Sequence, residues 1–298
     1  MNVLNKKIPS LFIVSGVYLL AIAAGVCSYI FIFQNTNVDI WIKLLVADVI
    51  ATTVVYIFSC IFRNASMYDA YWSVQPIVIV LGFFIVSKIT IFSILALIAV
   101  LVWGIRLTIN WIYTFDNLKW IDWRYKMLKE KTGIFYPIIN YLGIHMFPTL
   151  VVYSVIIPVV YGISMEVESN VGTYIFFIFA ILSAVLQGVA DCQMHAYRKN
   201  RTTPFMRKGL WKHSRHPNYL GEINMWWSMG FMSVLSLVLT LDNSLYWIFL
   251  VGALVNTVMF LVVSIPMADK RQSRKEGFDQ YKKETFMLLP MKKWWVKK

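Results

Sequence analysis

Long apolar stretches are the feature that most restricts what this chain can fold into. They recur along most of the sequence, at lengths near the ~20 residues with which a helix crosses a bilayer. Only 14% of the residues are charged, well under the ~25% of an ordinary soluble domain. A segment surrounded by lipid must pair its own backbone polar groups, which a helix of this length does. The sequence therefore predicts an all-α, polytopic bundle of membrane helices.

We expect about eight such helices, with the third short enough to be re-entrant rather than spanning. Their expected ranges are 10–33, 40–62, 74–87, 89–115, 136–164, 171–195, 219–241 and 244–266. The first is too long for the core of a signal peptide and is interpreted as a retained span. No linker rich in Pro, Gly or Ser and no internal repeat interrupts the chain, which favours a single integral membrane domain over residues 1–298.

The charged loops predict how the helices are oriented. Basic side chains concentrate in the N-terminal tail, in 116–133, in 196–218 and after Pro266, and eight spans place all four segments on one side. The positive-inside rule then puts both termini in the cytoplasm, at a bacterial inner membrane or a eukaryotic endoplasmic reticulum. The formal net charge of +13 is interpreted as contact with anionic lipid head groups rather than with nucleic acid.

Ionisable side chains inside the spans are few, and such residues are costly and usually functional. Asp191 and His195 are four residues apart on one face of the sixth span, and Glu222 opens the seventh. We expect functional roles for Asp191 and Glu222 because each adjoins a basic loop, whereas Asp48 and Asn256 are interpreted as polar contacts between helices. No third ligand of suitable spacing accompanies the Asp–His pair, so no metal site is predicted.

The densest group of polar residues is WKHSRHPNYLGE at 211–222. Pro217 suits the first turn of a helix, whose free backbone N–H groups attract anions. Arg215 adds a guanidinium group whose shape matches a phosphate, and Asn218 is able to cap the helix or to hydrogen-bond a ligand. The pattern predicts a site for a phosphate-bearing cofactor. An anchor for lipid head groups is the alternative, but it needs only the basic residues and leaves Asn218 and Glu222 unexplained.

A second polar group, RNASMYDAYWSVQP, occupies 63–76. Asp69, Tyr71, Trp72 and Gln75 supply an acid, a phenol, a flat aromatic ring and an amide. One interpretation is an aromatic belt at the membrane surface with a helix cap. The other is a substrate-facing acid that polarises a carbonyl group. The residues alone leave both open.

Six short motifs follow one another along the chain. They are YDAYWSVQP at 68–76, IDWRY at 121–125, DCQ at 191–193, GLWKHSRHPNYLGE at 209–222, VSIPMADKRQ at 263–272 and FDQYKKETFMLLP at 278–290. In this order they resemble the steroid 5α-reductase family, and most closely its bacterial branch, a domain family of unknown function that carries the reductase C-terminal region. The resemblance implies a reductase-like core of seven helices over 40–298 and an additional N-terminal span over 1–39.

The resemblance also implies an activity, a membrane reductase that uses NADPH. In such enzymes a hydride passes from the nicotinamide to the β-carbon of an enone, and a proton reaches the α-carbon. The substrate class is a lipid or a steroid-like molecule of the 3-oxo-Δ4 type. By motif position, the residues implied to bind NADPH are Arg124, Asp191, Arg198, Arg215, His216, Asn218, Tyr219, Glu222, Arg271 and Tyr281. Those implied to act on the substrate are Asp69, Tyr71 and Trp72.

The chain departs from this family on the substrate side. Characterised steroid reductases place a Gln-Glu pair and a tyrosine beside the substrate carbonyl group, whereas the stretch before Pro76 reads WSVQ and has no Glu. Two other functions share part of the pattern. One is a membrane methyltransferase of the isoprenylcysteine carboxyl or phospholipid type, which uses S-adenosylmethionine and usually carries two adjacent glutamates where this chain reads PMADKRQSRKEG. The other is a non-enzymatic lipid- or sterol-binding protein.

Overall fold

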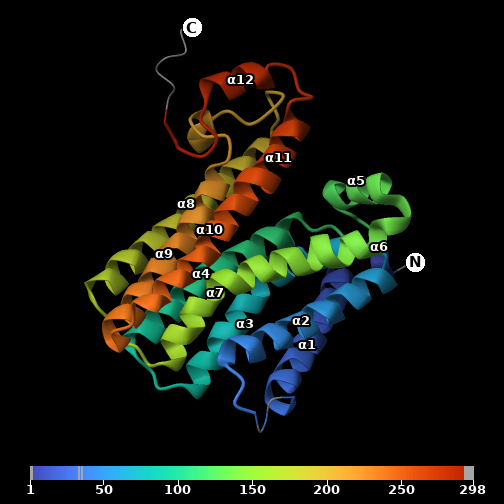
Figure 1. Ribbon diagram of the computed structural model, residues 1–298. Coiled ribbons are helices and arrows are strands. Elements are labelled where there is room, and N and C mark those ends of the chain that lie inside the picture. The colour runs from blue at the N-terminus through green and yellow to red at the C-terminus, as the bar shows by residue number, and fades with distance from the viewer. Residues whose placement is uncertain (1–2, 33, 35, 292–298) are drawn as a thin grey trace. The chain divides into compact units, whose positions relative to one another are not determined.

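A computed structural model describes residues 3–32, 34 and 36–291 of the chain. Within them, eight helical segments are long and apolar enough to cross a membrane (Figure 1). These segments are Lys7–Phe31, Ile40–Ile61, Ala65–Val86, Ile91–Thr114, Trp123–Ser164, Val171–Lys199, Pro217–Leu241 and Ser244–Gln272. The prediction of an all-α polytopic bundle is confirmed, and the chain is an integral membrane protein with several spans.

Each span consists of one α-helix or of several helical pieces joined end to end. The α-helices are α1 (Lys7–Phe31), α2 (Ile40–Ile61), α3 (Tyr71–Val86), α4 (Ile91–Thr114), α5 (Trp123–Thr132), α6 (Tyr136–Ile139), α7 (Phe147–Ser164), α8 (Val171–Lys199), α9 (Pro217–Leu241), α10 (Leu250–Met259), α11 (Ile265–Gln272) and α12 (Phe278–Glu284). The 3-10 pieces are η1 (Val3–Asn5), η2 (Ala65–Tyr68), η3 (Gly133–Phe135), η5 (Gly209–Lys212) and η6 (Ser244–Phe249). Two π-helical pieces, η4 (Asn140–Met146) and η7 (Phe260–Ser264), lie within the fifth and eighth spans.

The third span is longer than its apolar stretch predicts. The polar helix η2 precedes α3, and together they form one segment of 22 residues. Asn64 starts it, because its side chain accepts a hydrogen bond from the backbone N–H of Ser66 at 2.9 Å and donates one to the carbonyl oxygen of Leu118 at 2.6 Å. The expected start at residue 74 was therefore too late, since hydropathy misses a turn that a polar cap holds in place.

Contacts divide the chain into two compact units. Unit 1 comprises Met1–Val86 and Trp103–Val160, and unit 2 comprises Ser87–Val102 and Tyr161–Lys298. The divisions fall within α4 and α7, so both helices contribute to both units. Within unit 1, α1 packs on α2, which places the first span in the same unit as the start of the expected reductase-like core. The single domain and the boundary at residue 39 stay predictions.

Small residues allow α1 and α2 to approach closely in unit 1. A Cβ atom at Gly25 would lie 3.2 Å from the Cβ of Ala51 and 3.3 Å from the carbonyl oxygen of Ala47, the kind of contact that packs membrane helices. The buried hydroxyl group of Tyr18 donates a hydrogen bond to the carbonyl oxygen of Met67 at 2.5 Å. Helix α1 thereby holds η2 and the polar start of the third span.

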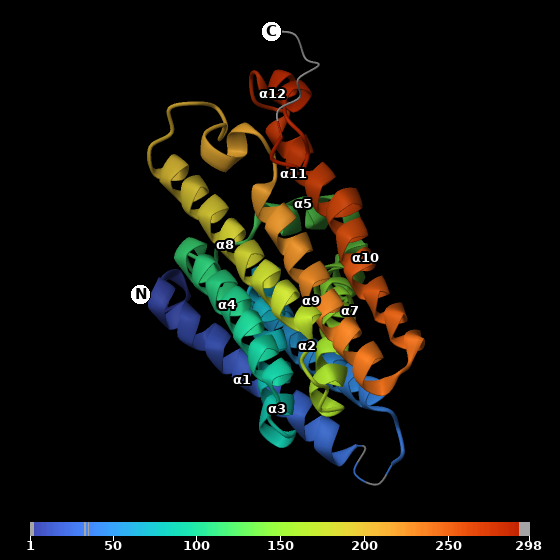
Figure 2. The same ribbon diagram turned by 90° about the vertical axis from the view of Figure 1, so that its left-hand side faces the viewer.

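Unit 2 is built on the pair α8 and α9, with α10 packed beside α9 (Figure 2). Close approach again depends on a glycine, because a Cβ atom at Gly221 would lie only 2.7 Å from the backbone oxygen of Ser183 on α8. This explains the glycine in the motif that ends YLGE. Helices α11 and α12 follow α10 at the end of the unit where α9 begins (Figure 1).

Candidate functional site

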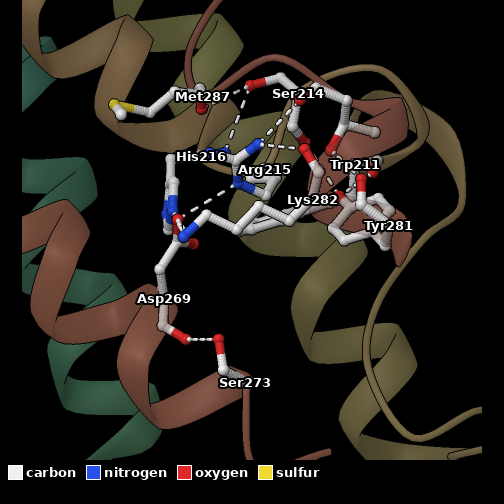
Figure 3. A network of polar contacts seen from close by, with 10 residues as sticks. Trp211, Ser214, Arg215, His216, Asp269, Ser273, Tyr281, Lys282 and Met287 are labelled. Carbon is white, nitrogen blue, oxygen red and sulfur yellow. Dashed lines mark hydrogen bonds and ion pairs between the residues drawn. The ribbon is translucent and has the colours of Figure 1, made fainter. Parts of the chain in front are cut away.

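The segment that leads into α9 pairs with the segment that follows α12. The backbone N–H of Arg215 donates to the carbonyl oxygen of Phe286 at 3.1 Å, and that of His216 donates to Met287 at 3.2 Å. Ser214 and Phe286 form an isolated parallel bridge. Segments about 70 residues apart in the sequence are thus joined beside the first turn of α9 (Figure 3).

A buried carboxylate on α11 holds the side chains of Arg215 and His216. Arg215 Nε donates to one oxygen of Asp269 at 3.3 Å, and His216 Nε2 lies 2.9 Å from the other (Figure 3). Arg215 Nη1 also donates to the carbonyl oxygens of Lys282 at 3.2 Å and Thr285 at 2.8 Å. Arg215 and His216 are each only 6% exposed. Their polar groups are engaged within the protein, so their observed role is to fasten α9, α11 and α12 together.

Two tyrosines complete this network. The buried hydroxyl group of Tyr281 donates to the carbonyl oxygens of Trp211, through a short hydrogen bond, and of Ser214 at 3.3 Å. Burial raises the pKa of the Tyr281 phenol, so its hydroxyl group stays protonated and remains a donor. The ring of Tyr219 stacks on His216 with a centroid separation of 5.2 Å and an interplanar angle of 4°.

Glu222 is buried one turn into α9 and is oriented from both sides. Gln187 Nε2 on α8 donates to one carboxylate oxygen at 2.6 Å, and Trp226 Nε1 donates to the other at 2.8 Å. Glu222 is therefore held in a defined position on the first turns of α9.

Asn218, on the first turn of α9, leaves a hydrogen-bond acceptor unused. Its Oδ1 atom is buried and has no hydrogen-bond partner in the described part of the chain, and neither has Oε1 of Gln272 at the end of α11. Buried polar atoms are nearly always paired, so an unused acceptor requires an explanation. A ligand that presents N–H groups would supply the missing donors.

Four cations gather at this end of unit 2, two from the end of α8 and the loop after it and two from the end of α11 and the loop after it. The charges of Arg201 and Arg271 act on Arg198, and those of all three act on Lys275. Partial burial, followed by this repulsion, lowers the pKa of the Lys275 ammonium group. Asp191 on α8 is a nearby acid whose charge acts on Arg198. Like charges in proximity are unfavourable, and a polyanion would relieve the repulsion.

In unit 1, the predicted catalytic acid is engaged in a salt bridge. Arg124 Nη2 lies 3.3 Å from Asp69 Oδ1, and Arg124 Nε lies 2.8 Å from Asp122. The Tyr125 hydroxyl group donates a short hydrogen bond to the same oxygen of Asp69. This network fixes α5 against the residue that joins η2 to α3, so Asp69 acts as a structural link.

The other two residues expected at the substrate are aromatic neighbours of Asp69 in the sequence. Tyr71 is 2% exposed, and its ring contacts Tyr18 and Tyr68 at centroid separations of 5.5 Å and 5.8 Å. The ring of Trp72 meets that of Trp103 edge to face at 5.8 Å. Both rings pack inside unit 1.

A comparison with protein-family models matches residues 55–285 to a family described as "Protein of unknown function (DUF1295)". The chain belongs to this family. Neither a search of curated proteins nor a search of solved structures gave a match. Membership of a family of unknown function is thus confirmed, and the link to steroid 5α-reductases stays a prediction.

Membership in DUF1295 covers every residue expected at the site, while the first span precedes the match. Within the family region, the residues implied to bind the cofactor separate into two groups. Arg124 lies in unit 1 beside Asp69. The rest lie in unit 2, namely Asp191, Arg198, Arg215, His216, Asn218, Tyr219, Glu222, Arg271 and Tyr281. Their contact with a cofactor stays a prediction.

Sequence reasoning missed several residues that shape this site. Asp269 holds Arg215 and His216, and Gln187 orients Glu222. Asp269 is the one acid in the motif VSIPMADKRQ. The motif marks it as unusual, but the sequence does not indicate which residues it contacts. Arg201 and Lys275 join the cationic group from flanking loops, where a basic residue by itself is uninformative.

Proposed function

We propose that this protein is an NADPH-dependent membrane reductase that transfers a hydride to an activated C=C bond of an apolar, lipid or steroid-like substrate. The observation that carries the proposal is the group of four cations, Arg198, Arg201, Arg271 and Lys275, at the end of unit 2 where α9 begins. Bound there, NADPH would supply the hydride.

The cations match the phosphates of NADPH. Its pyrophosphate and 2′-phosphate together need several positive partners, and guanidinium groups bind phosphate oxygens in pairs. The first turn of α9 adds backbone N–H groups that point out of the start of the helix, and the positive end of a helix dipole. Pro217 lies in the first turn of that helix and has no backbone N–H group, so it leaves no donor there without a partner.

The uncharged part of the site matches the carboxamide of the nicotinamide. That group has two N–H donors, and Asn218 Oδ1 is a buried acceptor that has no donor in the described part of the chain. Gln187 and Trp226 hold the nearby carboxylate of Glu222 in a defined position. These residues would orient the ring, and the network of Asp269 would hold α9 and α11 in register around it.

On the substrate side, unit 1 supplies the residues for the proposed reaction. An enone develops negative charge on its oxygen as hydride arrives, so a hydrogen-bond donor at that oxygen lowers the barrier. Tyr71 is the buried phenol among the expected residues, and Trp72 would border the apolar part of the substrate. Asp69, with its salt bridge to Arg124, would position the start of α3.

Cofactor binding by the detergent-purified protein tests the proposal. NADPH is expected to raise the unfolding temperature measured by calorimetry much more than NADH or S-adenosylmethionine, because ligands that bind only the folded state stabilise it. Stabilisation by S-adenosylmethionine alone would show a methyltransferase-type site. Binding of apolar ligands without any NADPH effect would show a lipid- or sterol-binding protein.

A matched pair of variants locates the phosphates. Arg271→Gln removes one of the four cations, whereas Arg274→Gln removes another exposed arginine three residues further on. Charged hydrogen bonds contribute ~1.5–3 kcal/mol, so Arg271→Gln is expected to weaken NADPH binding about 10- to 100-fold and Arg274→Gln much less. Equal effects in both variants would contradict a specific phosphate site. Consumption of NADPH with an enone then tests the reaction itself.

A further inference from the structure

A group of buried polar side chains in unit 1 has hydrogen-bonding capacity that the fold does not use. Asp48, on α2, is 3% exposed, and neither of its carboxylate oxygens has a hydrogen-bond partner in the described part of the chain. Gln75, on α3, is 6% exposed and lies beside Asp48. Its amide is close enough to act on that carboxylate, yet its Nε2 atom makes no hydrogen bond of normal geometry among the described residues.

The hydroxyl groups around these two side chains are satisfied by one another. Tyr68 and Thr149 share a hydrogen bond of 2.8 Å, and Thr149 shares another of 3.1 Å with Thr52. Tyr71 lies beside both Thr52 and Asp48. Helices α2 and α7 and the segment η2–α3 thus surround Asp48 and Gln75. The hydroxyl groups on these elements bond to one another and leave the carboxylate of Asp48 without a hydrogen bond from them.

His145, in the π-helical piece η4, extends the group past Tyr68. Its ring lies 4.9 Å from the ring of Tyr68. Its Nδ1 atom lies 2.9 Å from the carbonyl oxygen of Asn140, so Nδ1 carries the proton. The other nitrogen, Nε2, has no partner in the described residues although the side chain is fully buried.

Buried polar atoms without hydrogen-bond partners lower the stability of the fold unless a ligand supplies the missing partners. A buried donor or acceptor without a partner costs free energy comparable to a lost hydrogen bond. An ionisable residue within a membrane span is retained where it binds, conducts or reacts. Asp69, the acid expected at the substrate, differs from Asp48 because Arg124 and Tyr125 already donate hydrogen bonds to it.

We infer that Asp48, Gln75 and Tyr71 bind the carbonyl oxygen of an apolar ligand inside unit 1. Gln75 Nε2 and the Tyr71 hydroxyl group are donors, and the acid form of Asp48 donates a third hydrogen bond. The inference rests on the proposed function and deepens it, because it assigns the residues that hold the reducible group. The acid beside the carbonyl group is thus Asp48 on α2 and not Asp69.

Stability separates a ligand site from a structural contact. Asp48→Leu replaces an unpartnered carboxyl group by an apolar side chain of similar size, so the unfolding temperature in detergent is expected to stay equal to wild type or rise. Asp269→Leu is the control, because that carboxylate is equally buried but satisfied by Arg215 and His216. It is expected to unfold several degrees lower. A comparable loss in Asp48→Leu would overturn the inference, since it would show a structural role.

Binding is measured in the same protein without any cofactor. Cholest-4-en-3-one and cholest-4-ene have the same hydrocarbon frame and differ by the ketone. Wild type is expected to bind the ketone about tenfold more tightly, which corresponds to about 1.4 kcal/mol, and Asp48→Leu is expected to bind both equally. Asp48→Asn, which keeps an N–H donor, is expected to retain most of the preference.

Two binding results would contradict the site. One is a wild type that binds neither compound or does not distinguish them, and the other is an Asp48→Leu variant that keeps the preference. NADPH is absent throughout, so a failure of the proposed cofactor site leaves these results unchanged. Conversely, a normal NADPH effect together with no ketone preference would remove the Asp48 site alone.

Discussion

At the residue scale, one carboxylate determines how the C-terminal motif is held. Asp269 accepts hydrogen bonds from the buried side chains of Arg215 and His216, with Lys282 Nζ 4.0 Å from one oxygen. A buried cation without a counter-charge is far more costly than an exposed one. The cationic motif RHPN therefore depends on an acid 53 residues downstream of His216.

Asp269→Asn is the substitution that tests this dependence. It keeps the shape of the side chain but leaves Arg215 buried without an anion, so we expect a loss of about 3–5 kcal/mol in the free energy of unfolding. Denaturant or thermal unfolding in detergent measures the loss. Asp279→Asn, an exposed carboxylate on α12, serves as the control and should change stability little. Similar stability of the two variants would show that the charge of Asp269 is dispensable.

Individual residues also show what the sequence can and cannot predict about the site. The motif 211–222 predicted a polar, cationic group at a helix start, and the structure places Asn218 and Glu222 on the first turns of α9. The partners were not predictable in the same way. Gln187 and Asp269 lie 35 and 53 residues from the groups they hold, and no local pattern encodes a contact that only tertiary packing creates.

At the scale of elements, hydropathy located the helices but not their polar ends. The apolar stretches predicted all eight spans within a few residues at most boundaries. The exceptions are the polar extensions, namely η2 before α3, α5 before α6, and the last turns of α8 and α11. Caps such as Asn64 and Asp122 hold the first two. These extensions carry Arg124, Arg198 and Arg271, so some of the candidate site residues lie where hydropathy predicts the helix ends least well.

Packing of α8 against α9 depends on Gly221, and Gly221→Ala tests it. The added Cβ atom would lie 2.7 Å from the backbone oxygen of Ser183 and 2.5 Å from Gln187 Cγ. Because backbone atoms cannot move aside as a side chain can, the helices must separate, and overpacking of this kind typically costs about 1–3 kcal/mol. The separation would also strain the hydrogen bond from Gln187 to Glu222 and weaken NADPH binding.

Gly230→Ala, nine residues further along α9, is the matched control. Its Cβ atom would meet Leu250 Cδ2 at 3.2 Å, the end of a side chain that can turn away. Alanine also favours a helix over glycine by about 1 kcal/mol, so this variant should be as stable as wild type. Equal stability of Gly221→Ala and Gly230→Ala in thermal unfolding would disprove the close contact.

At the scale of the whole molecule, the number of spans and the distribution of charged loops predict on which side of the membrane the two termini lie. Eight spans are expected to put both termini on one side, together with the basic segments at 116–133, 196–218 and after Pro266. The positive-inside rule predicts that this side is the cytoplasm. NADPH is soluble and cytoplasmic, so the proposed cofactor site requires the same orientation.

Cysteine labelling in intact cells tests this orientation. In a background without Cys27, Cys60 and Cys192, single cysteines are introduced at exposed loop positions by Lys131→Cys, Lys283→Cys, Lys88→Cys and Glu168→Cys. A membrane-impermeant maleimide added outside should label only Lys88→Cys and Glu168→Cys. These positions lie in the loops with few cations, which the positive-inside rule places outside. The first two should react only after the membrane is opened. Labelling of Lys283→Cys from outside would place the cations of unit 2 away from cytoplasmic NADPH, and the proposed cofactor would then have no access to its site.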